Sequence, residues 1–438
     1  MQINQLTLTN FRGFEQAEFE FKSGMNLLVG INGVGKSTIL DVIRIMLSQV
    51  LPDITLSRNK RDSFNREEDI QIGRDSFSAE LRFDASGIAF KYLVFEQLEK
   101  YAENTSQESA IELLKDRRRR IQERRSANEP YNLQFRHDLT PKTISKEIKN
   151  AVEQPLALYF STTRSSIVKA NISKQKTAGG QRFAFAQALN SRQLNIGEFA
   201  DWMLTQHSVS ISDNNVLAKR HLELLQNAIP YFLENCMNFR AVSQSGKHRI
   251  STLKVDKYGS QFDIHQLSDG ERGILVLVLD IARRLIVANP KLEDPLREGK
   301  AVILIDELDL HLHPRWQRMV VHKLTEIFPN CQFIATTHSP QMIGEVEPEN
   351  IIILDQDKQP YIPDQSLGMD SNWILRFLME TPERDINTQK TLEKIESLIK
   401  QRNFPEATEQ INSLRELGNF PELVRLQTRI DRIRLLGK

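Results

Sequence analysis

Cysteine is nearly absent from this sequence. The chain has 438 residues, of which only Cys236 and Cys331 are cysteines. Two cysteines cannot build a disulfide framework, and neither belongs to a C-x-x-C pair that would indicate a zinc site. This usage is typical of a reducing compartment, so we expect the protein in the cytoplasm.

Long apolar runs are absent as well. A membrane-spanning helix is indicated by an uninterrupted run of about 18 apolar residues, and no run in this chain is that long. The N-terminal "MQINQLTLTNFRGF" alternates like a strand and lacks the charged start and apolar stretch of an export signal. The sequence therefore predicts neither an export signal nor a membrane partner.

An excess of one charge sign is the third absence. Lysine and arginine number 58, aspartate and glutamate number 57, and the net charge is +1. Such a balance creates no overall field that would indicate nucleic acid, so any basic surface must be local. The chain is long enough for one large domain with insertions, or for two domains.

Strand and helix patterns alternate along much of the chain. Apolar runs that suit strands lie at 25–30, 155–163, 301–306, 331–337 and 350–355, and segments with helical spacing separate most of them. Alternation of this kind predicts an α/β fold with a mainly parallel sheet. A strand pair at 76–84 and 88–96 predicts an antiparallel edge, and residues 181–240 are predicted to be mostly helical.

The segment "GINGVGKS", residues 30–37, carries the strongest chemical signal. It matches G-x-x-x-x-G-K-[ST] and lies between an apolar strand and a helix. Its glycines allow backbone amides to surround phosphates, Lys36 reaches the β and γ phosphates, and Ser37 supplies an oxygen to magnesium. The predicted nucleotide-binding residues of this phosphate loop are Asn32, Gly33, Val34, Gly35, Lys36, Ser37 and Thr38.

Three further polar residues follow buried strands. Asp306 ends "AVILID" and is expected to meet magnesium, because a buried carboxylate there is costly without a cation. Glu307, the next residue, is predicted to polarise the attacking water as a catalytic residue. His338, in "FIATTHSP", is the second predicted catalytic residue, placed to bond the γ-phosphate or the water.

The nearby pair His311 and His313, in "HLHP", raises the alternative of a metal site. No further ligand cluster accompanies the pair, and a turn that ends on a helix-starting proline explains the segment. We therefore favour the turn.

Four segments in this order, "GINGVGKST", "LSDGERG", "VILIDELDLHLHP" and "ATTHSP", resemble the ABC-type ATPases of the branch that contains RecF, SMC, Rad50 and the OLD-family proteins. The resemblance implies ATP and Mg²⁺ as cofactors. "LTNFRGF" is similar to the N-terminal strand of that branch, whose arginine approaches the nucleotide, here Arg12. Gln71, in "EDIQIG", takes the place of the branch's glutamine loop, which contacts magnesium or water.

The second of these segments is a small turn directly before a long apolar helix. In the branch that it resembles, this turn faces the γ-phosphate held by a second subunit. The resemblance therefore implies a homodimer or a higher oligomer with composite sites. The residues expected to contact the nucleotide of the other copy are Ser268, Asp269, Gly270, Glu271 and Asp309.

The resemblance implies the head of an ABC-type P-loop ATPase with a helical insertion and a short helical C-terminal tail. We expect four parts. They are an ATPase lobe with the P-loop at 1–96, a charged and helical insertion at 97–240 that includes the strand at 155–163, the signature, Walker B and His-loop part at 241–362, and a helical module at 363–438. "NFPE" occurs twice in that module, each time where a proline starts a helix.

Within the branch, "PLALYFSTTRS" and "GMDSNWILRFLMETPERD" resemble the PtuA ATPases of Septu anti-phage systems and their retron-associated relatives. This resemblance implies an ATP-hydrolysing dimeric switch that regulates a partner nuclease of the HNH type. The short helical tail argues against a nuclease site in this chain itself. A DNA-repair ATPase of the RecF kind and an ATP-bound scaffold with little turnover stay open as alternatives. The basic segment 115–125 either contacts nucleic acid, whether DNA or the DNA and RNA of a retron, or forms a solvated helix.

Overall fold

The computed structural model describes residues 1–57, 61–97, 131–135, 141–165, 180–190, 196–212, 215–244, 250–382, 384–418 and 421–436. The chain divides into two compact units, Met1–Met369 and Asp370–Lys438. The four-part division expected from the sequence stays a prediction. The basic segment 115–125 lies outside the described residues.

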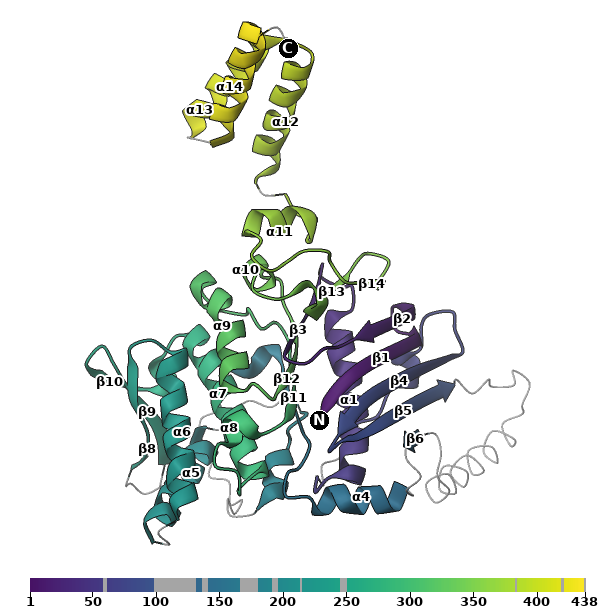
Figure 1. The fold of residues 1–438 in the computed structure, drawn as a ribbon, viewed down its shortest axis with the longest axis vertical. Coiled ribbons are helices and arrows are strands. Elements are labelled where there is room, and N and C mark those ends of the chain that lie inside the picture. The colour runs from purple at the N-terminus through teal and green to yellow at the C-terminus, as the bar shows by residue number, and fades with distance from the viewer. Residues whose placement is uncertain are drawn as a thin grey trace, which may run out of the picture. The chain divides into compact units, whose positions relative to one another are not determined.

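A six-stranded sheet lies at the centre of the first unit, in the order β14-β13-β3-β12-β11-β7 (Figure 1). Its neighbouring strands are parallel except for β14, which pairs antiparallel with β13. The strands are β3 (Met25–Gly30), β7 (Leu156–Phe160), β11 (Ala301–Ile305), β12 (Gln332–Thr336), β13 (Ile351–Leu354) and β14 (Pro360–Tyr361). The predicted α/β fold with a mainly parallel sheet is confirmed.

The middle strands of this sheet are apolar and covered on both faces. Every residue of β11 and of β12 is buried. Continuous burial explains why these strands are mainly apolar in the sequence instead of alternating between apolar and polar residues. The strand predicted inside the insertion, β7, also belongs to this sheet and pairs with β11.

A separate five-stranded antiparallel sheet contains the predicted strand pair, in the order β2-β1-β4-β5-β6. Its strands are β1 (Gln2–Phe11), β2 (Phe14–Glu20), β4 (Ser76–Ala85), β5 (Ile88–Gln97) and β6 (Tyr131–Phe135). β2 was not predicted from the sequence. It forms because its buried residues Phe14, Ala17 and Phe19 turn toward the core while the polar residues between them face outward.

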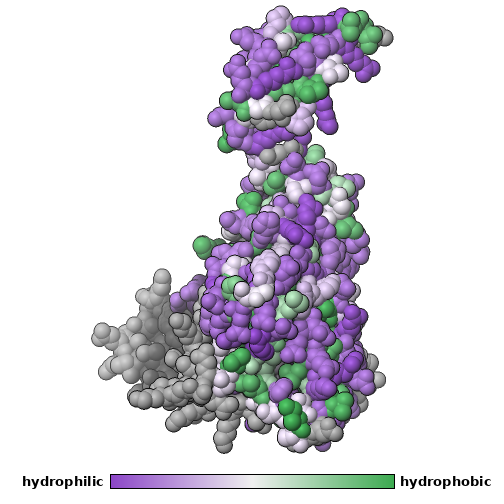
Figure 2. All heavy atoms as spheres, turned by 90° about the vertical axis from the view of Figure 1, so that its left-hand side faces the viewer, coloured by the Kyte–Doolittle hydropathy of each residue, from purple (hydrophilic) through white to green (hydrophobic). Residues whose placement is uncertain are grey.

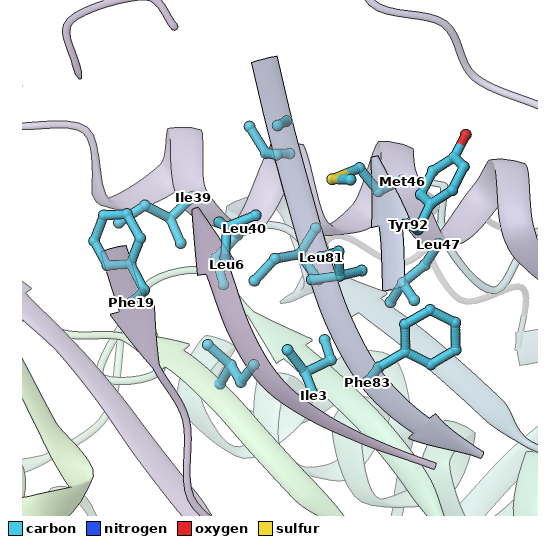
Figure 3. Packing of buried hydrophobic residues seen from close by; sticks show 14 of the residues in the cluster. Ile3, Leu6, Phe19, Ile39, Leu40, Met46, Leu47, Leu81, Phe83 and Tyr92 are labelled. Atoms are coloured by element: carbon cyan, nitrogen blue, oxygen red, sulfur yellow. The ribbon is translucent and has the colours of Figure 1, made fainter. Parts of the chain in front are cut away.

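Helix α1 (Lys36–Ile54) packs against this antiparallel sheet. In Figure 3, Ile39, Leu40, Met46 and Leu47 of the helix meet Ile3, Leu6, Phe19, Leu81, Phe83 and Tyr92 of the strands. The same buried cluster contains Leu28, Val302 and Ile334 of the parallel sheet. Because α1 is fixed by packing to both sheets, the loop that precedes it has a defined position.

The other helical segments of the first unit are mostly short. They are α2 (Arg66–Asp69), α4 (Pro141–Asn150), η1 (Thr162–Ser165), η2 (Gln181–Phe185), α5 (Ile196–Ser212), α6 (Val216–Phe232), η3 (Ile264–Gln266), α7 (Asp269–Ala288), α8 (Pro295–Glu298), α9 (Pro314–Ile327), α10 (Pro340–Ile343) and η4 (Pro348–Asn350). The long helix α7 is buried along most of its length and begins at the small turn noted in the sequence.

The prediction of a mostly helical segment at 181–240 is correct for α5 and α6 and wrong from Cys236 onward. There the chain forms β8 (Cys236–Gln244), which pairs with β9 (Ile250–Lys257) and continues to β10 (Ser260–Asp263). Pairing with the following strand decides the conformation of β8, and no local pattern reveals it. Figure 2 shows the side of this unit that carries these strands as mainly hydrophilic, with scattered hydrophobic side chains.

The second unit is helical, as predicted for the C-terminal module. It contains α11 (Ser371–Phe377), α12 (Ile386–Lys400), α13 (Phe404–Leu417) and α14 (Pro421–Leu436). The two "NFPE" segments lie at the starts of α13 and α14, with proline in the first positions of each helix. Apolar residues of α12, α13 and α14 form a buried cluster of their own.

None of the helices in the described parts of the chain is both long and apolar enough to pass through a membrane.

Candidate nucleotide site

The phosphate loop connects the end of β3 to the start of α1. Gly33 and Gly35 have φ angles of 83° and 111°, a region that side chains disfavour. A Cβ atom on Gly35 would also lie 2.6 Å from the ring of Phe14. The side chain of Lys36 is folded over the loop, where its Nζ donates to the carbonyl oxygens of Gly30 at 2.8 Å and Ile31 at 2.9 Å.

The order of the parallel sheet brings distant segments to this loop. β3, β12 and β11 are neighbours, so the residues that follow their carboxyl ends meet at one edge. An open cavity at that edge is lined by Asn32, Gly33, Gly35, Lys36, Ser37, Thr38, Glu307, Thr336 and His338. The predicted phosphate-loop and catalytic residues therefore share one cavity, while the side chain of Val34 packs into the core instead.

Asp306 lies beside the serine of the phosphate loop. Ser37 Oγ donates to Asp306 Oδ1 at 3.0 Å, and Thr336 Oγ1 donates to the same oxygen at 2.7 Å. Asp306 is only 8% exposed. A hydroxyl and a carboxylate in direct contact at the mouth of a phosphate loop form an oxygen donor set of the kind that Mg²⁺ prefers.

Glu307 has a strained backbone at the edge of the cavity. Its φ angle is 48°, in the left-handed region that non-glycine residues seldom adopt. Its amide donates to Thr336 Oγ1 at 2.7 Å, and the amide of Leu308 donates to the carbonyl oxygen of Thr336 at 2.9 Å. Neighbouring strand ends thus hold this turn in a conformation that places Glu307 on the cavity wall.

Asp309 accepts hydrogen bonds from His338 and from the residue before it. Asp309 Oδ1 accepts from Thr337 Oγ1 at 2.8 Å and from the amide of His338 at 3.3 Å. Burial lowers the pKa of His338, and the charge of Lys36 lowers it further. The ring of His338 is therefore mostly neutral at neutral pH and can accept a hydrogen bond at one nitrogen and donate at the other.

The ammonium group of Lys36 lies close to three carboxylates. Burial lowers the pKa of Lys36, while Asp306, Glu307 and Asp309 oppose that shift. A cluster of one ammonium and three carboxylates attracts a metal ion together with a polyanion more readily than either alone.

Arg164 is a site residue for which the sequence analysis assigned no role. It is 5% exposed, and it donates to the carbonyl oxygens of Asp306 and Glu307, both at 2.5 Å. Burial lowers the pKa of Arg164 to about 10, so the side chain stays charged at neutral pH. Its place four residues after the end of the buried strand β7 was the available signal in the sequence.

Arg12 and Gln71 lie together near the first turns of α1. Arg12 Nε donates to Asp69 Oδ1 at 2.8 Å, and its Nη2 lies 3.5 Å from Asp41 Oδ2 on α1. The amide of Gln71 donates to the carbonyl oxygen of Asn10 at 2.9 Å. The Gln71 Oε1 atom is buried and has no hydrogen-bond partner in the described part of the chain.

The predicted signature turn caps α7, and its first residue, Ser268, is exposed. Ser268 Oγ donates to Glu271 Oε2 at 2.9 Å, and Lys257 pairs with the same carboxylate group. Asp269 is exposed, and Gly270 is buried against the carbonyl oxygen of His311. The residues that line the cavity at the phosphate loop, among those that the structure describes, do not include Ser268.

The neighbouring histidine pair lies in the segment that leads into α9. His313 caps α9 by accepting a hydrogen bond at Nδ1 from the amide of Arg315, so the predicted turn is confirmed. Within the described ranges, no group of three or more histidine, cysteine, aspartate or glutamate residues is arranged to hold a metal ion.

Comparisons with known proteins agree with this geometry. The family model described as "AAA ATPase domain" matches residues 1–343. The chain is 28% identical to a retron Ec83 probable ATPase of Escherichia coli, over 91% of this chain and 80% of that protein. It is 27% identical to a retron Vc95 probable ATPase of Vibrio cholerae serotype O1 biovar El Tor, over 81% and 74%.

A further relative is the Septu protein PtuA of Bacillus thuringiensis, which is 24% identical over 86% of this chain and 83% of that protein. These similarities confirm the resemblance to retron-associated and Septu ATPases that the sequence motifs indicated. Together with the family model and the cavity at the phosphate loop, they establish that the chain belongs to the AAA ATPase domain family and is an ATPase.

Proposed function

We propose that this chain binds ATP between two copies of itself and uses hydrolysis to switch a partner nuclease of the HNH type in a bacterial anti-phage system. The observation that carries the hydrolytic part is that Lys36, Ser37, Glu307 and His338 line the same open cavity. The relation to retron ATPases and to a Septu protein supports the defence role.

The phosphate loop holds the triphosphate. Its backbone amides point toward the anion at the N-terminus of α1, and Lys36 exchanges its two carbonyl partners for the β and γ phosphates. This exchange requires little movement because Lys36 already lies over the loop. Arg12 and Gln71 are proposed to approach the nucleotide and its metal from the side of the antiparallel sheet.

Ser37 and Asp306 would hold Mg²⁺, since their oxygen atoms are in contact at the mouth of the loop. When bound, the ion neutralises charge on the phosphate oxygens. Glu307 orients the attacking water as a general base, and His338 bonds the γ-phosphate or that water. The neutral imidazole can do so as a donor without adding a full charge beside Lys36.

The signature turn is proposed to serve the nucleotide of the other copy. Ser268 is exposed at the N-terminus of α7 and lies outside the wall of its own phosphate cavity, as far as the structure describes it. Its hydroxyl and the first amides of α7 would donate to the γ-phosphate of the neighbouring chain. Asp269, Gly270, Glu271 and Asp309 remain the other residues proposed to contact that nucleotide, although Gly270 and Glu271 are buried within this chain.

Phosphate release tests the hydrolytic part directly. We expect turnover by the wild-type chain, loss of turnover in Glu307→Gln with ATP binding retained, and loss of binding in Lys36→Ala. Binding is measured with a fluorescent ATP analogue. Full turnover in Glu307→Gln would contradict the role of this residue, and a wild-type chain that binds ATP without releasing phosphate would favour the scaffold alternative.

Co-purification tests the partner. The chain is expressed with an HNH nuclease encoded beside its gene, and size-exclusion chromatography with and without ATP is expected to show a complex whose nuclease activity depends on nucleotide. The control is the same nuclease expressed with the Glu307→Gln variant of this chain. Tight, ATP-dependent binding of duplex DNA by the chain alone, with no effect on the nuclease, would favour a repair ATPase of the RecF kind.

A further inference from the structure

Arg164 occupies an unusual position for a charged residue. It lies in η1, four residues after the end of β7, and β7 pairs in parallel with β11 so that Phe160 is the partner of Ile305. The amide of Asp306 donates to the carbonyl oxygen of Phe160 at 2.8 Å, which continues this pairing beyond the strand end. The chain after β7 therefore runs beside the residues that follow β11.

The guanidinium group contacts a series of consecutive carbonyl oxygens. Arg164 Nη1 donates to Asp306 at 2.5 Å, and Nη2 donates to Glu307 at 2.5 Å and to Leu308 at 3.3 Å. None of these acceptors is a side-chain carboxylate. Arg164 thus fixes the backbone path of the turn that carries the proposed general base.

That turn needs support because its central residue is strained. Glu307 has a φ angle of 48°, and a non-glycine residue in this region costs on the order of 1–3 kcal/mol unless its surroundings hold it. On one side Thr336 accepts from the amides of Glu307 and Leu308. On the other side Arg164 donates to the carbonyl oxygens of the same turn. The turn is therefore held through its amide groups and through its carbonyl groups.

The chemistry of arginine suits this task better than that of lysine. The planar guanidinium presents several donors in a fixed fork and spans two neighbouring carbonyl oxygens at once, whereas an ammonium group is a compact point charge on a flexible stem. The charge also faces Asp309, Asp306 and Glu307, whose carboxylates stabilise the buried cation. A neutral substitute would lose both the fork and this attraction.

We infer that Arg164 is a positioning residue for ATP hydrolysis, which acts by holding the backbone of Asp306, Glu307 and Leu308 so that the Glu307 carboxylate faces the γ-phosphate. This inference rests on the proposed role of Glu307 and extends it to a residue that touches neither nucleotide nor metal. It makes the turn after β11 depend on the segment that follows β7.

The test compares Arg164→Lys with the wild-type chain in full-length protein. Misplacement of a catalytic group by about 1 Å costs about 100-fold in rate, and we expect kcat to fall by that order. The Kd of ATP is expected to stay near the wild-type value, because the phosphate loop is untouched. Rates are expressed per ATP-binding site, counted by titration with a fluorescent analogue, so that misfolded chains do not contribute.

Arg284→Lys is the matched control. Arg284 is also buried and also donates to backbone carbonyl oxygens, those of Ala184 at 2.6 Å and Ala186 at 3.1 Å, but it lies on α7 away from the cavity. We expect Arg284→Lys to lose stability and to keep its kcat per site. If Arg164→Lys does not fold, Arg164→Gln, which retains two donors, is measured in the same way.

The outcomes separate the inference from the proposed function. Turnover retained in Glu307→Gln would overturn the assignment of the base itself. Loss of turnover in Glu307→Gln, combined with an unchanged kcat in Arg164→Lys or with an equal loss in Arg284→Lys, would overturn the positioning role alone. A selective loss of kcat in Arg164→Lys at constant Kd supports it.

Discussion

Two carboxylates that follow each other in the sequence have different surroundings and are therefore assigned different tasks. Asp306 is buried beside the phosphate loop and accepts hydrogen bonds from Ser37 and Thr336. Glu307 is partly exposed and lies on the cavity wall.

Metal dependence tests the assignment of Asp306. In Asp306→Asn we expect Mg²⁺ to lose its effect on ATP affinity, while affinity in excess chelator stays near the wild-type value. The reason is that an amide oxygen lacks the charge that attracts the cation. The measurement is titration of ATP with and without Mg²⁺, and Asp431→Asn, at an exposed position of α14, is the control. Equal Mg²⁺ effects in both variants would contradict the assignment.

Titration of His338 gives a second prediction. Because burial and Lys36 hold its pKa below 6.5 in the folded chain, the unfolded chain binds more protons at this ring as the pH falls. The neutral ring therefore contributes its full stability above pH 6.5. This contribution is lost as the pH falls from 6.5 toward the lower pKa of the folded chain. We expect the nucleotide-free wild-type chain to lose more stability in acid than His338→Gln, measured by urea unfolding at a series of pH values. Parallel curves would contradict this.

At the scale of elements, the start of α7 and the loop after β11 are in direct contact within one chain. A Cβ atom on Gly270 would lie 2.4 Å from the carbonyl oxygen of His311, a distance that no side chain tolerates without movement. His311 itself has a φ angle of 61°. The signature turn and the loop that carries Glu307 are therefore packed against each other, although we propose that Ser268 and Glu307 serve different nucleotides.

Gly270→Ala tests this contact. The added methyl group must displace the loop after β11, so we expect a loss of about 1–3 kcal/mol of stability together with a clear fall in kcat. Gly299→Ala is the matched control. Gly299 follows the last residue of α8, and its Cβ atom would lie 2.4 Å from the carbonyl oxygen of Pro295. We expect Gly299→Ala to lose similar stability and to keep its kcat. Equal kinetic effects would argue against a specific link to the site.

Much of the site was predictable because its residues follow buried parallel strands. β3, β11 and β12 are mainly apolar and almost wholly buried, and Lys36, Asp306 and His338 come shortly after their ends. β2 and β8 were missed because their conformation depends on pairing with neighbouring strands. Arg164 was missed because its partners are backbone carbonyl oxygens 142 to 144 residues away, which no local pattern specifies.

At the scale of the whole molecule, each of the two compact units has a core of its own. Ile411 of α13 is fully buried in the C-terminal cluster. Truncation by Ile411→Ala is expected to cost about 2–5 kcal/mol in the unfolding of that unit. Phosphate release by the ATPase unit is expected to stay unchanged. Calorimetry that shows one shared transition, or a loss of turnover in this variant, would contradict independent cores.

The central claim also concerns the whole molecule, namely that each ATP lies between Lys36 of one copy and Ser268 of another. Co-expression of differently tagged Ser268→Arg and Lys36→Ala chains tests it, since each variant alone is expected to be inactive. Random pairing makes about half of the dimers mixed, and each mixed dimer has one of its two composite sites intact. The unfractionated mixture should therefore recover about a quarter of wild-type phosphate release. No recovery in demonstrated mixed dimers would contradict the claim, because two groups that act on one phosphate within the same chain cannot complement each other.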